Sequence, residues 1–364
     1  MLLPTPGGRD APVPPDDAGV SFIMPVLNEE RYLRRAVGST LSQDVPGPVE
    51  IVLALGPSTD GTTAIARELA AEDDRIVLVE NPDADIPVGL NLALGVSRYP
   101  TVVRVDAHSE LSPGYTLRAL ATLARTRAAN VGGVMRADGR SPFQRAVARA
   151  YNARVGLGGG AYHGGSPEGP AESAYLGVMR RAAIDEVGGF DPSLRRGEDW
   201  ELNLRLRRAG YRVWFDPALS VVYWPRESWT RLVRQFRATG AWRGELVRRY
   251  GRRNSLRFFA PPALVAATVL SAATGVWQIG RRVRGRRSAA ASVVHVPVAA
   301  YAALVALAAL GRAGGGGWRD RMWTAAVLPS MHLSWGAGFV GGVLRGARDT
   351  VDTSRLNGRN TPLP

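Results

Sequence analysis

The sequence predicts an α/β domain built on a parallel sheet, followed by apolar helices long enough to enter a membrane. Three observations support this. Strand-like and helix-like segments alternate between residues 20 and 107, the strands are apolar on both faces, and three long uncharged stretches follow residue 257. Apolar strands that alternate with helices are typical of parallel sheets covered on both faces. The chain has 364 residues, 45% of them hydrophobic, which allows about two domains.

The first part of the chain carries the alternation. We expect strands at 20–27, 49–55, 75–81 and 101–107, and helices at 28–43, 63–73 and 86–97. In such sheets ligands bind beyond the carboxyl ends of the strands. The polar loops 56–62 and 106–112 follow two of these strands and therefore mark the expected site.

Beyond residue 130 the pattern changes. A Gly-rich stretch at 156–170 reads as a mobile loop, a helix follows Glu198, a strand covers 211–216, and a basic helix with interleaved aromatic residues covers 229–254. Residues 1–18 are rich in proline and lack an apolar signal-peptide core, so we expect a disordered leader there.

The last third of the sequence is apolar. The uncharged stretches 258–280, 288–311 and 324–344 contain 23, 24 and 21 residues. Each could span a hydrocarbon core of about 30 Å. Three spans would place the Arg-rich segment 281–287 opposite the α/β domain, which the positive-inside rule disfavours. An interfacial or re-entrant first stretch would keep that segment cytoplasmic, and the sequence leaves both topologies open.

These patterns divide the chain into five parts. The predicted boundaries are a leader at 1–18, the α/β domain at 19–228, an amphipathic interfacial helix region at 229–257, a membrane domain of two to three helices at 258–344 and a polar tail at 345–364.

The composition excludes several classes of function. The net charge is +14 and all 46 basic residues are Arg, which suits either nucleic acid or an anionic membrane surface. No nucleic-acid-binding signature is present, and the apolar stretches favour the membrane. The absence of Cys excludes disulfides and thiolate chemistry, and no G-x-G-x-x-G follows the first strand, which excludes a Rossmann dehydrogenase.

Asp106 and His108 stand two residues apart where the strand at 101–107 ends. Such a triplet is, taken alone, usually a turn with a solvated His. A carboxylate and an imidazole together also suit Mn²⁺, Mg²⁺ or Zn²⁺. A metal there would bridge a diphosphate, whose oxygens and water would complete the coordination shell. His163, in the Gly-rich loop, is either a solvated loop residue, a third ligand or part of a lid.

Three further stretches favour the metal interpretation. They are MPVLNEE (24–30), GPSTDGTT (56–63) and GEDWEL (197–202). In this order, together with VDAH at 105–108, they resemble the family 2 glycosyltransferases, which have the GT-A fold. The resemblance covers about residues 19–245. Within the family the sequence looks most like a membrane-anchored glucosyltransferase of exopolysaccharide synthesis.

The resemblance implies roles for particular residues. Asp199 would be the general base, and Glu198 would orient it or bind the acceptor; without the resemblance both would be acids at a helix N-terminus. A divalent metal, Mn²⁺ or Mg²⁺, would lie on Asp106 and His108, with His163 as a possible third ligand. The donor would contact Pro25, Asn28, Glu29, Ser58, Asp60, Asn91 and Asp106, and the acceptor would contact Gly177, Trp200, Arg234, Gln235 and Arg237.

Two departures from the family pattern bear on specificity. The family usually has acidic residues just before the S-T-D-G turn, where this chain has Ala54, Leu55 and Gly56, so the donor's base stays open. Processive members carry QxxRW, whereas residues 234–242 read RQFRATGAW. We therefore do not expect processive polymerisation.

We therefore expect an inverting, metal-dependent transferase on the cytoplasmic side of the cell membrane. It would transfer a sugar from a nucleotide-sugar donor to a polyprenyl-diphosphate-linked sugar, in the synthesis of an exopolysaccharide or envelope glycan. The donor we expect is UDP-glucose or a relative. The alternatives are a polyprenyl-phosphate sugar synthase and a catalytically dead membrane scaffold. Membrane lipid would be a partner through the basic helix, and nucleic acid would not be one.

Overall fold

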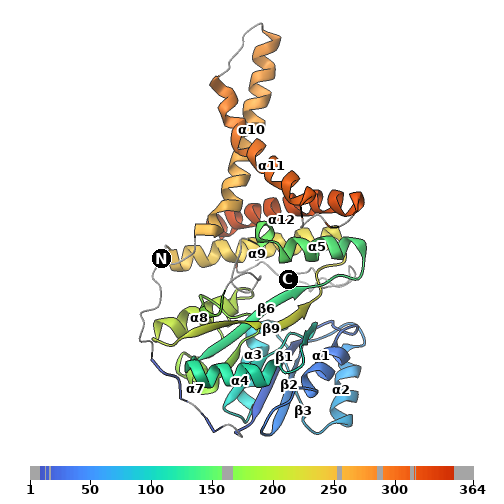
Figure 1. The fold of residues 1–364 in the computed structure, drawn as a ribbon, viewed down its shortest axis with the longest axis vertical. Coiled ribbons are helices and arrows are strands. Elements are labelled where there is room, and N and C mark those ends of the chain that lie inside the picture. The colour runs from blue at the N-terminus through green and yellow to red at the C-terminus, as the bar shows by residue number, and fades with distance from the viewer. Residues whose placement is uncertain are drawn as a thin grey trace. The chain divides into compact units, whose positions relative to one another are not determined.

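The structure, a computed structural model, describes residues 9–12, 14–15, 18–157, 167–251, 256–284, 290–311, 315 and 317–347. These residues form two compact units (Figure 1). Unit 1 contains the described residues up to 138 and those from 167 to 224. Unit 2 contains residues 139–157 and the described residues from 225 onward. Residues 139–157, expected in the α/β domain, thus belong to the helical unit.

Unit 1 is built on a mixed sheet, which in the described part of the chain has nine strands. Their order is β3-β2-β1-β4-β8-β6-β9-β5, with β7 paired to β9. The strands are β1 (Val20–Val26), β2 (Val49–Leu55), β3 (Ile76–Glu80), β4 (Thr101–Arg104), β5 (Ser109–Leu111), β6 (Asn130–Ala137), β7 (Gly169–Pro170), β8 (Val178–Arg180) and β9 (Val213–Tyr223).

The parallel sheet expected from the sequence is confirmed for the first four strands. β1 pairs in parallel with β2 and β4, and β2 with β3. Beyond them the sheet is mixed, because β8 runs antiparallel to β4 and β6, and β5 and β7 run antiparallel to β9, whereas β6 and β9 pair in parallel. The fold of unit 1 is therefore a mixed α/β sheet.

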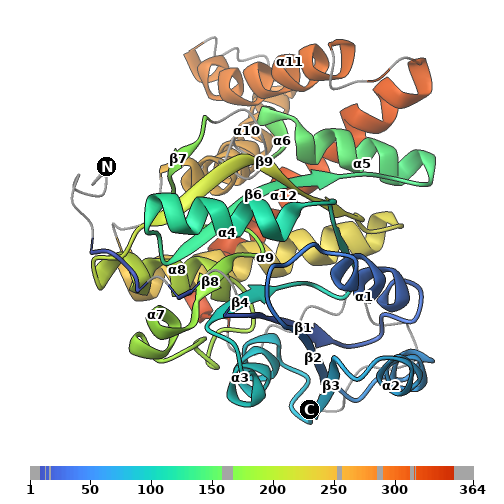
Figure 2. The same cartoon turned by 60° about the horizontal axis from the view of Figure 1, so that its bottom comes forward.

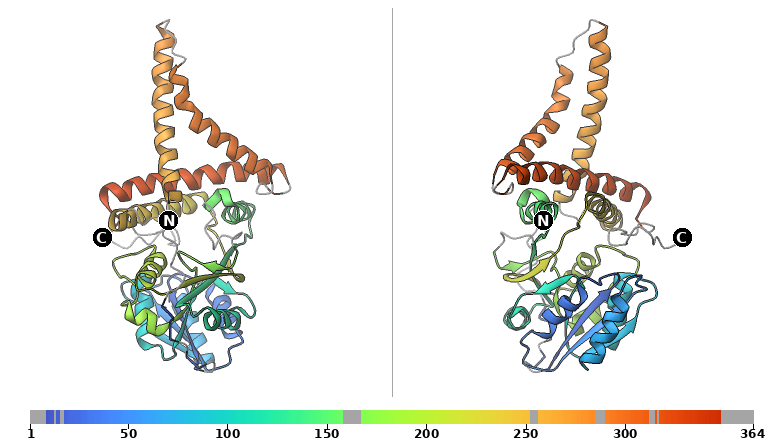
Figure 3. Two further views of the ribbon diagram at one scale, coloured as in Figure 1. Left: turned by 60° about the vertical axis from the view of Figure 1, so that its left-hand side comes forward. Right: turned by 90° about the vertical axis from the view of Figure 1, so that its right-hand side faces the viewer.

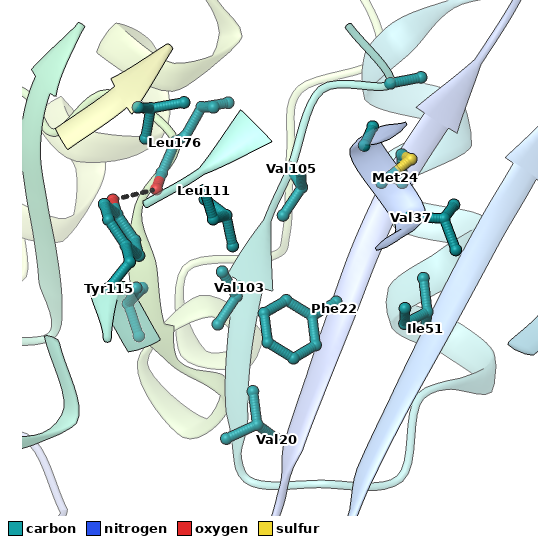
Figure 4. Close-up of a cluster of buried hydrophobic side chains, with 14 of the residues drawn as sticks. Val20, Phe22, Met24, Val37, Ile51, Val103, Val105, Leu111, Tyr115 and Leu176 are labelled. Carbon is teal, nitrogen blue, oxygen red and sulfur yellow. Dashed lines mark hydrogen bonds between the residues drawn. The ribbon is translucent and has the colours of Figure 1, made fainter. Parts of the chain in front are cut away.

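Helices cover both faces of this sheet (Figure 2). They are α1 (Leu33–Leu41), α2 (Thr62–Glu72), α3 (Ile86–Val96), α4 (Tyr115–Thr126), α7 (Arg181–Glu186) and α8 (Glu198–Arg208). Successive residues of a strand point to opposite faces, so Phe22 and Met24 join one core with α1, α2 and α4 (Figure 4). Ile23 joins a second core with α3, α7 and α8.

Three local expectations differ from the structure. The first helix begins at Leu33 rather than Asn28, because Asn28 adopts a left-handed φ of 55° within a turn. The strand expected at 211–216 runs on to Tyr223. Residues 9 and 11 of the expected leader pack on unit 1, since the Arg9 N–H donates to the Gly210 carbonyl (2.8 Å) and Ala11 is buried.

Unit 2 is helical. It contains α5 (Pro142–Asn152), α6 (Arg154–Leu157), α9 (Trp229–Tyr250), the 3-10 helix η3 (Leu256–Phe259), α10 (Ala260–Val283), the 3-10 helix η4 (Ala290–His295), α11 (Val296–Leu310) and α12 (Trp318–Arg345). Three segments are long and apolar enough to cross a membrane by length and composition: Leu256–Val283, Ala291–Leu310 and Trp318–Arg345. Figure 3 shows α10 and α11 as a hairpin that stands crosswise on α12.

Candidate active site

Two loops at the carboxyl ends of β1 and β2 are joined by side-chain hydrogen bonds. The backbone N–H of Asn28 donates to Ser58 Oγ (3.0 Å), and that of Glu29 donates to Thr62 Oγ1 (2.8 Å). Asp60 accepts the N–H of Thr62 (3.1 Å). The predicted donor residues Asn28, Glu29, Ser58 and Asp60 therefore share one edge of the sheet. Several of their polar groups shape the two loops themselves.

Asp106 and His108 follow β4 at the same edge. His108 Nδ1 lies 3.0 Å from Glu29 Oε1, and both side chains are largely buried. Metal-binding imidazoles usually hold one ring nitrogen against a carboxylate in this way, which leaves Nε2 for the ion. Within the described ranges, no three His, Cys, Asp or Glu side chains gather closely enough to hold a metal ion. An ion held by Asp106 and His108 would therefore need oxygens from a bound diphosphate or from water to complete its coordination.

Arg104, the last residue of β4, sits among three carboxylates that we call the acidic cluster: Asp106, Glu198 and Asp199. Its guanidinium lies 3.1 Å from Asp106 Oδ1 and 2.9 Å from Glu198 Oε1, and it also contacts Asp199 Oδ1. Arg104 is 4% exposed, whereas Asp199 keeps 27% of its side chain accessible. One buried cation therefore joins the predicted metal ligand to the predicted base.

The first turn of α8 presents the two acids. Gly197 precedes the helix with a left-handed φ of 82°, a conformation that suits glycine because it has no Cβ. Glu198 and Asp199 follow at the positive end of the helix dipole, which stabilises carboxylates. The turn thus directs both acids toward β4.

The pKa of the Asp199 carboxyl is raised to about 7. Burial is the main cause, and the nearby charges of Glu198 and Asp106 add to it, while Arg104 acts in the opposite direction. A carboxyl with a pKa near neutrality can take up a proton and release it at physiological pH. The site therefore provides a carboxylate suited to acid–base work.

A second layer of polar groups supports α8. Asn203 Nδ2 donates to the Asp199 carbonyl (2.7 Å), and Asn130 Nδ2 donates to Asn203 Oδ1 (2.7 Å). The backbone N–H of Arg104 donates to the carbonyl of Gly177 (3.1 Å), where a Cβ would collide with the Asn130 side chain. Gly177 is thus close to the acidic cluster through the backbone of β4.

The other predicted site residues lie on several different elements. Pro25 lies within β1 opposite Ala54, and Trp200 is buried in α8. Asn91 on α3 exchanges both amide hydrogen bonds with the Phe190 backbone (2.8 and 2.9 Å), so its side chain holds two elements together. The three remaining acceptor residues, Arg234, Gln235 and Arg237, lie on α9 in unit 2. His163 lies outside the described residues.

Sequence reasoning missed Arg104. The signal was present, because TVVRV places one charged residue in an otherwise apolar strand. A buried guanidinium requires a carboxylate partner. Its partners on α8, Glu198 and Asp199, are 94 and 95 positions away along the chain, so the sequence did not reveal that they pair with Arg104.

The chain is similar to known glycosyltransferases. The family model "Glycosyl transferase family 2" matches residues 21–188. "Succinoglycan biosynthesis protein ExoA" of Rhizobium meliloti (strain 1021) is 33% identical over 331 residues, which cover 87% of this chain and 93% of that protein. A Methanococcus voltae dolichyl N-acetyl-alpha-D-glucosaminyl phosphate 3-beta-D-2,3-diacetamido-2,3-dideoxy-beta-D-glucuronosyltransferase is 24% identical over 240 residues, covering 63% of this chain and 74% of that protein.

One solved structure has the same fold along most of its length. It is the mannosyltransferase PcManGT from Pyrobaculum calidifontis in complex with GDP-Man and Mn²⁺, with a TM-score of 0.59, 21% sequence identity, and coverage of 93% of this chain and 90% of that one. This likeness supports the GT-A fold. The family match and the 33% identity over nearly the whole of ExoA show that this chain belongs to the family 2 glycosyltransferases.

Proposed function

We propose that this enzyme transfers one sugar, glucose from UDP-glucose in the simplest case, to the hydroxyl of a polyprenyl-diphosphate-linked sugar. The transfer takes place at the cytoplasmic face of the cell membrane and supplies an exopolysaccharide or envelope glycan. The likeness to a succinoglycan biosynthesis protein supports this choice. The acidic cluster around Arg104 is the observation on which the proposal rests.

Asp199 is the general base in this proposal. An inverting transfer requires a base that removes the acceptor hydroxyl's proton as the oxygen attacks the anomeric carbon. Asp199 is partly accessible, has a pKa raised to about 7, and is fixed by Arg104 and by its place in α8. Glu198 is more deeply buried, which favours a supporting role in orienting Arg104 and Asp199.

The same carboxylate argues against a lipid phosphate as the acceptor. A phosphate oxygen is already ionised at neutral pH and attacks without a base, whereas a sugar hydroxyl needs one. A carboxyl whose pKa lies near 7 is therefore more useful to a hydroxyl acceptor. The polyprenyl-phosphate sugar synthase is therefore the second candidate function.

Asp106 and His108 would hold the divalent cation, Mn²⁺ or Mg²⁺. When bound, the cation would neutralise negative charge on the departing nucleoside diphosphate. Glu29 orients the His108 ring, and Arg104 orients the Asp106 carboxylate. These contacts let the chain hold the two ligands in place before the donor arrives.

A transfer assay tests the proposal. Purified protein in detergent would receive UDP-, GDP- and dTDP-sugars, with Mn²⁺, Mg²⁺ or EDTA, and either polyprenyl phosphate or polyprenyl-diphosphate-linked sugar. We expect metal-dependent transfer to the diphosphate-linked sugar. Transfer to polyprenyl phosphate alone would replace the proposal by the synthase, and nucleotide binding without transfer from any donor would favour the scaffold.

A further inference from the structure

Helices α9 and α12 lie side by side and run in the same direction over their whole length. Near their first residues Trp229 packs against Trp323 (ring centroids 6.4 Å apart). Near their last residues Gly346 lies beside Arg248. One face of α12 is buried along this contact, including Val327, Met331 and Gly338.

The contact is close because both helices have glycines there. A Cβ on Gly240 of α9 would collide with the backbone of Trp335, and one on Gly244 with that of Phe339. On α12, a Cβ at Gly338 or Gly342 would collide with the backbone of α9 in the same way. The two helices therefore form one rigid pair, and α12 cannot take an orientation to the membrane different from that of α9.

The sequence of α9 is incompatible with the interior of a bilayer. Its 22 residues include six Arg, at 231, 234, 237, 243, 248 and 249, and Glu245. Arg234, Arg237 and Arg248 are exposed. Charged side chains at the centre of the hydrocarbon are costly, whereas Arg beside Trp and Phe suits the headgroup region. A spanning α12 would draw these charges into the hydrocarbon.

Helix α10, unlike α9, is apolar and exposed along most of its length. Its contacts with α12 involve its first turns, where a Cβ on Gly336 would collide with the Pro261 backbone and approach Val265. None of the apolar window of the Leu256–Val283 segment is buried, compared with 39% of that of α12. Exposed residues such as Val269, Val276 and Ile279 continue along it. Its 24 residues extend about 36 Å, enough to cross the hydrocarbon.

We propose that α12 lies flat at the membrane surface beside α9, and that only the α10–α11 hairpin crosses the bilayer. Although α12 has the length and composition of a span, its buried face is already occupied by α9 and α5. Phe143 and Arg149 of α5 contact Trp323 and Asp320 of α12 (ring centroids 5.6 Å apart; N to O 3.1 Å). The two crossings return the chain to the side from which it started.

The distribution of Arg agrees with this topology. In the sequence, five Arg lie between 281 and 287, in the segment that joins the two helices of the hairpin. Six Arg lie between 243 and 257, in the segment that leads into the hairpin, and three lie between 312 and 321, in the segment that follows it. The excess in the segments before and after the hairpin places that side in the cytoplasm under the positive-inside rule.

The absence of Cys from the chain makes the topology directly measurable. Single-Cys variants Val283→Cys, Trp318→Cys and Leu344→Cys place a thiol at the hairpin tip and at either end of α12, all at exposed positions. Val96→Cys, exposed on α3, marks the side of unit 1. A membrane-impermeant maleimide would be applied to the full-length protein in intact spheroplasts and in inverted vesicles. Each variant is first checked for folding by its size-exclusion profile in detergent. Met322→Cys replaces Trp318→Cys, and Val340→Cys replaces Leu344→Cys, where the first variant fails to fold.

We expect Trp318→Cys, Leu344→Cys and Val96→Cys to react only in inverted vesicles, and Val283→Cys only in spheroplasts. If Leu344→Cys reacts only in spheroplasts, as expected for Val283→Cys, α12 spans the membrane and the proposal is wrong. If Val283→Cys reacts only in inverted vesicles, as expected for Trp318→Cys, the hairpin does not cross the membrane and the proposal is also wrong. This inference rests on the proposed membrane location but not on the proposed acceptor, because labelling does not require sugar transfer.

Discussion

Replacing Arg104 by Gln would remove the cation shared by the acidic cluster. Arg104 and Glu198 are 4% and 8% exposed, so water screens their interaction weakly. Removing one partner of a buried ion pair costs about 3–5 kcal/mol, because the opposite charge remains buried. Protonation of Asp199 would offset part of this cost. Its pKa is raised to about 7 even though Arg104 lowers it, so the loss of Arg104 would raise the pKa further. We therefore expect a destabilised but folded enzyme whose base is protonated at neutral pH.

The change in the Asp199 pKa has a kinetic signature. A cation at contact distance lowers the pKa of a carboxyl by about 1–3 pH units, so its loss should move the acidic limb of the kcat/KM profile upward by that amount. At pH 7 the ionised fraction of Asp199 would fall by about 5- to 500-fold, and transfer with it. The assay is transfer of radiolabelled sugar between pH 5.5 and 9.5.

Two variants separate this effect from general damage. Arg104→Lys restores the positive charge but not the planar guanidinium, so the acidic limb of its kcat/KM profile should return toward that of the wild type. Arg118→Gln breaks a separate ion pair with the buried Asp216 (2.9 Å) and should lower stability without moving the limb. An Arg104→Gln enzyme whose acidic limb matches that of the wild type would show that Arg104 does not control the Asp199 pKa.

Three further predictions follow from the site and the helical unit. In the wild type, kcat/KM should rise as the pH passes about 7 from below, because Asp199 ionises there, and a flat profile between pH 6 and 8 would contradict its role. Glu29→Gln should weaken Mn²⁺ binding by about 10- to 100-fold, because the His108 ring would lose the carboxylate that orients it. Calorimetry in the presence of nucleotide measures the affinity, and an unchanged affinity would show that His108 is not a ligand. Gly338→Leu should destabilise unit 2 by about 1–3 kcal/mol in thermal unfolding, whereas Gly280→Leu, in open space, should not; equal effects would argue against close α9–α12 packing.

Much of unit 1 could be predicted because its first four strands are apolar and separated by clear helices. The later strands gave weaker signals. β5, β7 and β8 contain only two or three residues each. β6 carries Gly132 and Gly133, where a Cβ would collide with the backbone of Tyr175 or of Leu219. Close approach of neighbouring backbones selects glycine there, and glycine weakens the pattern by which a strand is recognised.

The candidate site was predictable only where its residues are near one another in sequence. Asp106 and His108 follow one strand, and Glu198 and Asp199 begin one helix. Arg104, which joins the two groups, acts through contacts formed only by folding. The pairing of His108 with Glu29 was hidden for the same reason, since 79 positions separate the two residues.

The most direct measurement compares the rate of sugar transfer by Asp199→Asn with that of the wild type at saturating donor, acceptor and metal. Asn preserves the size of the side chain and removes its basicity, so we expect kcat to fall by about 10²- to 10⁴-fold while donor binding is kept. Asp191→Asn, which changes a carboxylate outside the acidic cluster, should retain wild-type kcat. An Asp199→Asn enzyme that transfers sugar at the wild-type rate would contradict the assignment of Asp199 as the base.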